Sequence, residues 1–136
     1  MENPAREDDY EEAKRPAKEF YRNIGHAWCS ALNDHVVFNS AGFRHLVWKG
    51  AEQRPKQEQE RRFKLLSSAE NILTTHHGTM EFREEIVLRI VKKYGHKMKE
   101  FSHAKFWGLT NRKNGKAVTL VIRQIDAGNK HFFSIY

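Results

Sequence analysis

The last two apolar segments of the chain carry basic, hydroxyl and aromatic residues at alternating positions. If residues 117–125 and 130–136 are strands, successive side chains point to opposite faces of a sheet, and the more apolar faces pack together. The second face then carries Arg123, Ser134, Tyr136 and Lys130. A guanidinium group beside hydroxyl groups is suited to contact a phosphate, so this face is a candidate anion-binding surface.

The apolar faces of the same strands set the expected core and register. The pairing places Phe133 and Ile135 beside Leu120 and Ile122, against the helices. Upstream, Asn114-Gly115 predicts a hairpin, because both turn positions tolerate a positive φ. A two-residue loop puts Phe106 beside Arg123, whereas a bulged loop puts Lys105 there, and both registers remain open.

His45 is the candidate for proton transfer. The short helix predicted at residues 41–48 has its apolar side chains on one side and His45 on the other. Imidazole titrates near neutral pH, so His45 is well suited to act as a general base or acid. The plain alternative is a solvated or hydrogen-bonded helix histidine without a chemical role.

Arg62 lies in an unusual position for a charged residue. In the helix predicted at residues 55–73 it projects from the centre of an apolar stripe, and Arg61 lies near the edge of that stripe. Such an arginine needs a partner. A phosphate on the sheet face is one candidate, and Glu58, four residues earlier on the same helix, is the structural alternative.

The composition limits the class of protein. The chain has 136 residues, which fits one domain, and its net charge of +7 favours a polyanionic partner. This charge is uneven, with a net −3 over residues 1–34 and a net +10 over residues 35–136. One cysteine, Cys29, excludes an internal disulfide and a Cys-rich zinc module.

Targeting and metal-binding patterns are missing from the sequence. No apolar run approaches about 18 residues, and the acidic start does not look like a signal peptide, so we expect a cytoplasmic protein. His76-His77 are adjacent and lack spaced Cys, Asp or Glu partners, so we expect no metal ion and no cofactor.

Helices and strands are expected in a particular order along the chain. Pro16 is expected to begin or kink a leading helix at residues 7–20, and Ser40 to cap the helix at 41–48. Strands are predicted at 36–38, 98–110, 117–125 and 130–136, and residues 80–91 suit helix or strand. The fold class is therefore α+β, with N-terminal helices followed by a roughly four-stranded antiparallel meander sheet.

Several segments together resemble a known family. Residues 36–39 (VVFN), 42–46 (GFRHL), 62–66 (RFKLL) and the closing 130–136 (KHFFSIY) resemble small bacterial and phage domains of the barnase/EndoU/colicin/RelE-like (BECR) nuclease superfamily. The resemblance covers residues 24–136, and the acidic leading helix at residues 1–23 is no part of the shared pattern.

The resemblance implies a metal-independent RNase, often a toxin, with its site on the sheet face opposite the helices. By position, it implies a catalytic set of His45, Arg62, Arg123 and Ser134. Substrate-binding roles fall to Arg61, Lys105, Lys130 and Tyr136. The implied partners are RNA and an antitoxin or immunity protein.

Two other functions remain open from the sequence. The first is a non-catalytic RNA-binding or toxin–antitoxin-type regulatory module on the same fold. The second is an interaction protein whose acidic leading helix covers its own basic face. For Ser134, a role as a small strand residue is the alternative to a catalytic one.

Overall fold

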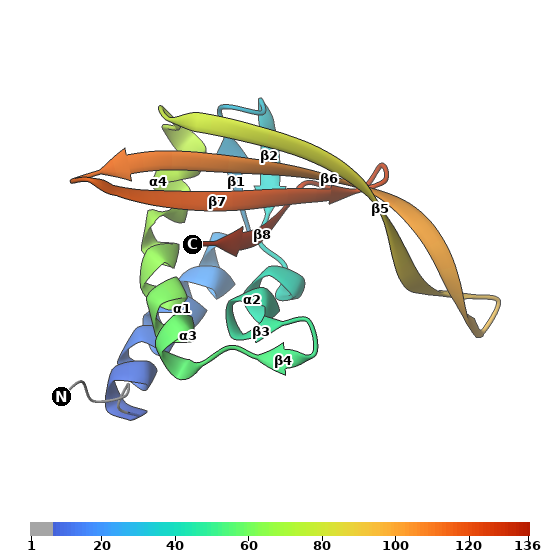
Figure 1. Cartoon of the computed structure of the whole chain (residues 1–136), viewed down its shortest axis with the longest axis horizontal. Helices are drawn as coiled ribbons and strands as arrows, with labels where there is room; N and C mark the ends of the chain where they lie inside the picture. Colours follow the sequence, from blue (N-terminus) through green and yellow to red (C-terminus); the bar gives the residue numbers. More distant parts are fainter. Residues whose placement is uncertain (1–6) are drawn as a thin grey trace.

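The computed structural model, which describes residues 7–136, combines a curved sheet with helices packed against it (Figure 1). The helices are α1 (Glu7–Ile24), α2 (Ser40–Val47), α3 (Lys56–Leu65) and α4 (Ala69–Thr74), with a 3₁₀ turn at Leu66–Ser68. The main sheet contains β1 (His26–Cys29), β2 (Asp34–Val37), β5 (Thr79–Lys93), β6 (His96–Lys113), β7 (Lys116–Ile125) and β8 (His131–Ile135). A separate two-stranded hairpin is formed by β3 (Trp48–Lys49) and β4 (Glu52–Gln53).

The α+β class is confirmed, but the predicted meander is too simple. The main sheet has six strands in the order β1-β2-β8-β7-β6-β5, and the helices are not all N-terminal, since α2 to α4 follow β1 and β2. β2 lies parallel to β8, while the other neighbours are antiparallel. The early hairpin β1–β2 thus extends the C-terminal meander, a long-range pairing that no local pattern encodes.

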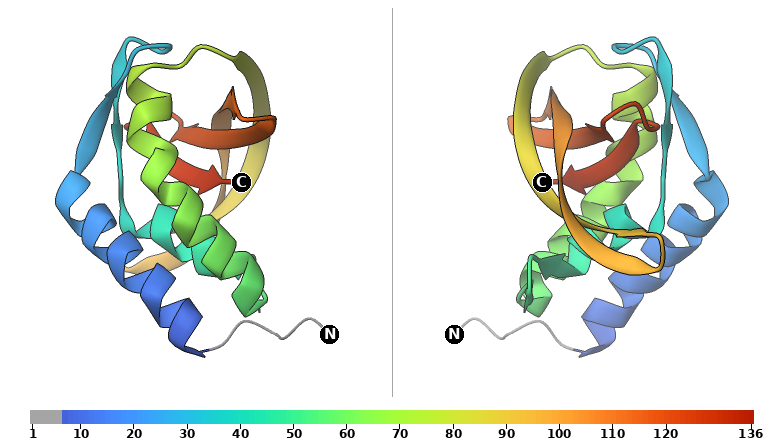
Figure 2. Two further views of the ribbon diagram at one scale, coloured as in Figure 1. Left: turned by 90° about the vertical axis from the view of Figure 1, so that its left-hand side faces the viewer. Right: turned by 90° about the vertical axis from the view of Figure 1, so that its right-hand side faces the viewer.

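The leading helix is part of the core. Four residues at three- and four-residue spacing in α1 are buried, namely Tyr10, Ala13, Ala17 and Tyr21. The helix continues through Pro16, which neither begins nor ends it. Figure 2 shows α1 and α3 side by side on the same side of the sheet. The face buried against α3 outweighs the hydrogen bond that proline cannot make.

Helix α2 lies very close to the last strand because of Gly42. A Cβ atom at this position would overlap the carbonyl oxygen of Phe132 and the hydroxyl of Tyr21. The N-cap is Asn39 rather than the expected Ser40, and its side chain accepts from the amide of Gly42 at 3.3 Å. This close approach brings the next turn of α2, with His45, to the sheet.

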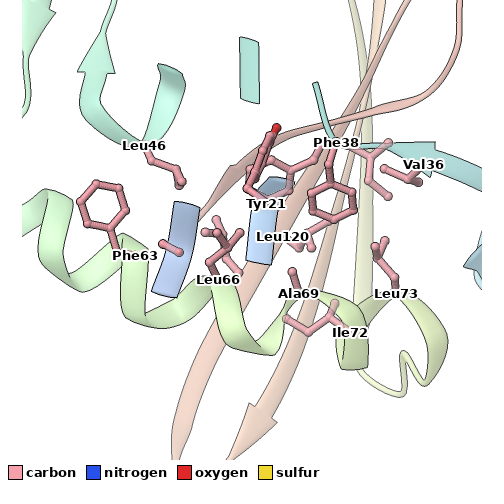
Figure 3. Close-up of a cluster of buried hydrophobic side chains, with 14 of the residues drawn as sticks. Tyr21, Val36, Phe38, Leu46, Phe63, Leu66, Ala69, Ile72, Leu73 and Leu120 are labelled. Carbon is pink, nitrogen blue, oxygen red and sulfur yellow. The ribbon is translucent and has the colours of Figure 1, made fainter. Parts of the chain in front are cut away.

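The predicted helix at 55–73 is divided by the 3₁₀ turn into α3 and α4. Its apolar stripe is nevertheless buried, and Leu66, Ala69, Ile72 and Leu73 lie in the core with the aromatic residues (Figure 3). The break keeps these side chains directed at the curved sheet over the whole length of the segment.

The predicted core face of the last strand is wrong at one position, Phe133. Ile135 does pair with Leu120, but a β-bulge between Val121 and Ile122 places Phe132, not Phe133, opposite Ile122. Phe132 is therefore fully buried among the helices, and Phe133 turns to the second face of the sheet. One extra residue shifts every side chain before it to the other face.

The ambiguous segment at 80–91 is strand. β5 pairs with β6 along its whole length, and together they extend well past the end of β7 (Figure 1). The turn at Asn114 and Gly115 has φ of 54° and 77°, as a two-residue hairpin loop requires. Phe106 accordingly lies opposite Arg123, and the alternative register with Lys105 is excluded.

Candidate functional site

A cavity of about 440 Å³ lies between the helical layer and the second face of the sheet. His45, Arg54 and Arg62 line it from the helical side, and Phe106, Ser134 and Tyr136 from the sheet. A volume of this size is typical of small-ligand sites, which span roughly 300–1,000 Å³. Most of its charged lining residues are cations, so an anion is the ligand that the cavity favours.

A second cavity of about 230 Å³ adjoins the first. It contains Arg123 and His131, and it shares His45 and Phe133 with the larger cavity. Of the arginines that line the two cavities, Arg54, Arg62 and Arg123 act on the imidazole of His45 through their charge.

Arg62 joins the helical layer to the last strand. Its Nε atom donates to Oε1 of Glu58 at 2.9 Å, and Nη1 donates to Oγ of Ser134 at 2.8 Å and to the carbonyl oxygen of Ile135 at 3.0 Å. Arg62 and Ser134 are both buried. The expected alternative partner, Glu58, is thus present, and part of this guanidinium has a structural role.

His45 is held by a residue from the loop that precedes α3. Arg54 donates from Nε to the carbonyl oxygen of His45 at 3.0 Å, and its Nη2 lies 3.4 Å from Nδ1 of the ring. A guanidinium has donors only, so Nδ1 accepts and the ring proton resides on Nε2. The imidazole also lies edge-on to Phe133, with 4.3 Å between ring centroids.

The surroundings of His45 favour its neutral form. Burial lowers the pKa of the imidazole to about 4, and the positive charges of Arg54, Arg62 and Arg123 act in the same direction. At neutral pH His45 therefore has a lone pair with which to accept a proton. A bound anion would offset the arginine charges and raise this pKa toward neutrality.

Arg123 is positioned by His131. Its Nε donates to Nε2 of His131 at 2.9 Å, and its guanidinium carbon lies 4.5 Å from the ring centroid of Phe133. Burial and the charge of Arg123 lower the pKa of His131, so a neutral ring accepts this hydrogen bond. The remaining guanidinium nitrogens are available for bidentate contact with a phosphate.

The structure brings together most of the residues predicted from sequence. His45, Arg62, Ser134 and Tyr136 line one cavity, and Arg123 lines the adjoining one. The guanidinium carbon of Arg62 is 6.0 Å from the ring centroid of Tyr136.

Three predicted substrate-binding residues lie elsewhere. Arg61 is exposed on α3 and donates to Glu58 at 3.1 Å. Lys105 pairs with Gln124 on the opposite face of the sheet from Phe106, a consequence of the register. Lys130 forms an ion pair with Asp34 at 2.7 Å and lies over Trp107, also away from the cavity.

Two residues of the site are not among the sequence predictions. Arg54 stands between short polar segments, and no periodicity or motif distinguishes it from other surface arginines. His131 is assigned to the core face by strict alternation, and the bulge moves it to the side of Arg123. A polar residue on an assumed apolar face is the one signal in the sequence that could have indicated such a bulge, and the sequence analysis did not use it.

Comparison of the chain with protein-family models, with curated proteins and with solved structures gives no match. Within residues 7–136, no three or more His, Cys, Asp or Glu side chains are grouped so that they could hold a metal ion. Among the described helices, none is long and apolar enough to cross a membrane.

Proposed function

We propose that the protein is a metal-independent endoribonuclease that cleaves RNA at the paired cavities around His45. The observation that carries this proposal is the neutral imidazole of His45 held among Arg54, Arg62 and Arg123. A proton acceptor surrounded by cations suits a reaction in which an oxygen nucleophile attacks an anionic phosphate. The resemblance to the BECR superfamily points to the same reaction and itself stays a prediction.

The proposed reaction is transesterification within the RNA chain. The 2′-oxygen forms a bond to phosphorus while the bond from phosphorus to the 5′-oxygen breaks, which leaves a 2′,3′-cyclic phosphate and a 5′-hydroxyl. His45 takes the proton of the 2′-hydroxyl, and the hydroxyl of Tyr136, which lines the same cavity, donates one to the departing 5′-oxygen. Arg54 and Arg123 stabilise the charge that develops on the phosphorane oxygens.

Arg54 can free the general base, Nδ1 of His45, when substrate binds. Its guanidinium group contacts Nδ1 of His45 at a long distance of 3.4 Å. A phosphate is the stronger partner for a guanidinium, because both of its oxygens accept from the planar group. Phosphate binding would therefore draw Arg54 away and leave Nδ1 free to accept the 2′-hydroxyl proton.

The test is cleavage of single-stranded RNA in the presence of EDTA. We expect cleavage by the wild-type chain, with 2′,3′-cyclic phosphate ends, and a loss of about 10²–10⁴-fold in rate for His45→Ala. The matched control is His35→Ala, since His35 is exposed on β2 and lies away from both cavities. Denaturation in urea checks that both variants remain folded.

A wild-type chain that leaves RNA intact at every enzyme concentration would overturn the proposal. Equal rates for His45→Ala and the wild type would remove His45 from the mechanism. Release of a 3′-phosphate without a cyclic intermediate would contradict attack by the 2′-hydroxyl.

A non-catalytic RNA-binding module is the second candidate, and one observation favours it. Ser134 and Arg62 are buried and bonded to each other, so two of the four predicted catalytic groups have structural partners. The cationic cavities would then bind phosphates without cutting. This candidate predicts binding that weakens steeply with salt, with a smaller salt slope when Arg123 or Arg54 is replaced, and no cleavage.

A further inference from the structure

The β5–β6 arm, residues 86–103, projects beyond the rest of the sheet. Ala104 is the last residue of β6 that pairs with β7, so past this point β5 and β6 pair only with each other. Figure 1 shows the arm curving away at the right of the molecule, far from α1 and α3. A two-stranded ribbon is marginally stable alone, so such an arm gains from packing against another surface.

One face of the arm is apolar near its base and basic near its tip. Leu88 pairs with Phe101, so these side chains share a face with Ile86 and Ile90. These four side chains are 55–74% exposed. Farther along the same face, Ile90 is opposite Lys99, and Lys92 is opposite Lys97. Contiguous exposed apolar side chains of this size are typical of a protein interaction surface.

The complementary surface is a groove between α1 and α3. It has a volume of about 710 Å³, and its apolar lining includes Ala13, Pro16, Phe20 and Phe63. Asp9, Glu12 and Glu60 supply acidic groups. Lys64 is the basic residue of this lining, and it is paired with Glu60 at 2.8 Å. The groove thus combines apolar surface with an excess of negative charge.

We propose that the β5–β6 arm of one copy docks in the α1–α3 groove of a second copy. Apolar side chains of the arm would pack on the apolar lining, and the lysines at its tip would face Asp9 and Glu12. The arm and the groove of one chain lie on opposite sides of the molecule, so the contact forms between chains (Figure 1). Reciprocal exchange of arms closes the assembly as a two-fold dimer.

Nucleic acid is the alternative occupant of the arm, and the apolar row argues against it. A phosphate backbone would satisfy Lys92, Lys97 and Lys99 but would leave Ile86 and Leu88 beside charged oxygens. A second copy satisfies both halves of the face, since the groove is apolar and acidic. This interface lies outside the proposed RNA site and does not depend on it.

Sedimentation over a range of protein concentrations tests the dimer. We expect the wild-type chain to dimerise reversibly, and Lys97→Glu/Lys99→Glu to raise the dimer dissociation constant by about tenfold or more. Arg112→Glu/Lys116→Glu is the matched control, because it makes the same charge change at the β6–β7 turn. A monomeric wild type, or equal effects of the two pairs, would overturn the proposal.

Charge reversal in the groove provides the decisive experiment. Asp9→Lys/Glu12→Lys is expected to weaken the dimer as the arm variant does, whereas Glu11→Lys/Glu19→Lys, on exposed positions of α1, leaves it unchanged. A mixture of arm variant and groove variant restores opposite charges at both contacts, so it should form a heterodimer of wild-type strength. The four substitutions combined in one chain should restore the homodimer.

Two results would contradict the docking. If the mixture stays monomeric while each variant remains folded, the arm and the groove are not partners. If the arm variant keeps its oligomeric state but loses affinity for single-stranded RNA, the arm is a nucleic-acid surface. Both readouts are independent of RNA cleavage, so failure here leaves the proposed catalytic site standing.

Discussion

The cavity around His45 and the β5–β6 arm both depart from the usual rule that charged side chains are exposed and apolar side chains are buried. At the cavity, Arg62 is buried and Arg54 and Arg123 are half-buried, and each of the three has a defined partner. In the arm, large apolar groups such as Ile90 and Phe101 are 69% and 74% exposed. Buried charge needs compensation within the chain, whereas exposed apolar surface gains only by contact with something outside it.

The comparison shows two ways in which a small domain retains surfaces for binding. The cavity is preorganised, because its cations are already held by Glu58, Ser134 and His131 before an anion arrives. The arm is held by its own strand pairing and by an exposed ion pair between Lys93 and Glu100 at 2.8 Å, and its apolar side chains stay exposed. Substitutions in the body should therefore cost folding free energy, and substitutions in the arm should affect association alone.

The largest expected effect is a difference in the loss of folding stability between a substitution in the body of the protein and one in the arm. Leu120→Ala removes a fully buried side chain and is expected to lower the free energy of unfolding by about 2–5 kcal/mol. Leu88→Ala, at a position that is 55% exposed, should change it by less than about 0.5 kcal/mol. Urea denaturation of dilute protein measures both, and a large loss for Leu88→Ala would show that the arm is folded into the monomer's core.

The next effect is a difference in RNA-cleavage rate between substitutions on the two faces of the sheet. Arg123→Gln, in the cavity, should lower the rate of RNA cleavage by about 10²–10³-fold, since it removes a cation from the developing phosphorane charge. Lys105→Gln, on the opposite face, should leave the rate within about twofold of wild type. Equal losses would indicate that overall charge, and not the cavity, determines the activity.

A smaller effect is the dependence of stability on pH. The pKa of His45 is lowered to about 4 in the folded chain, and that of His131 is also lowered, while an unfolded histidine titrates near 6.5. Below pH 6.5 the unfolded chain thus binds more protons than the folded one, so stability is lost as the pH falls from 6.5 toward 4.

The expected loss between pH 7 and pH 5 is roughly 1–2 kcal/mol, after allowance for screening of the part-exposed ring. His45→Asn should reduce this loss, and urea titrations at the two pH values measure it. Stopping at pH 5 keeps the carboxylates out of the comparison. An identical loss in His45→Asn and the wild type would show that the cavity does not hold His45 neutral.

The smallest effect is a change in the pKa of His45 when one neighbouring positive charge is removed. Removal of a neighbouring positive charge by Arg54→Gln should raise the pKa of His45 by roughly 0.5–1 unit. Arg61→Gln removes the same charge from the outer surface of α3 and should leave that pKa unchanged. Histidine resonances followed by NMR during a pH titration report both, and equal shifts would mean that the contact with Arg54 is not made in solution.

Local patterns predicted many elements of the fold correctly. The apolar stripe of the segment at 55–73 is buried, and Asn114-Gly115 forms the two-residue turn that places Phe106 opposite Arg123. Both depend on residues close in sequence, where helix periodicity and turn geometry apply directly. The pairing of β1 and β2 with the C-terminal meander was missed, because a parallel contact with β8 joins segments nearly a hundred residues apart.

The candidate site was also predicted only in part, because some of its contacts join residues that are far apart in the sequence. The resemblance, carried over by position, selected His45, Arg62, Arg123 and Ser134, and the structure places these four in or beside one cavity. Arg54 was missed because its function depends on its distance from His45 in space. Lys105 was misplaced because the strand register had two solutions until the turn was known.

The amino-acid sequence by itself determined the charge division, many of the helical and strand segments, and the residue types available for phosphate chemistry. Only the tertiary structure decided which of these residues meet. A single bulged residue in β8 moves His131 next to Arg123 and turns Phe133 from the core to His45, and Gly42 allows α2 to approach closely enough for that contact. Strand faces alternate with a period of two, so one inserted residue reverses every assignment before it, and His131 on the expected apolar face is the one local sign of the insertion.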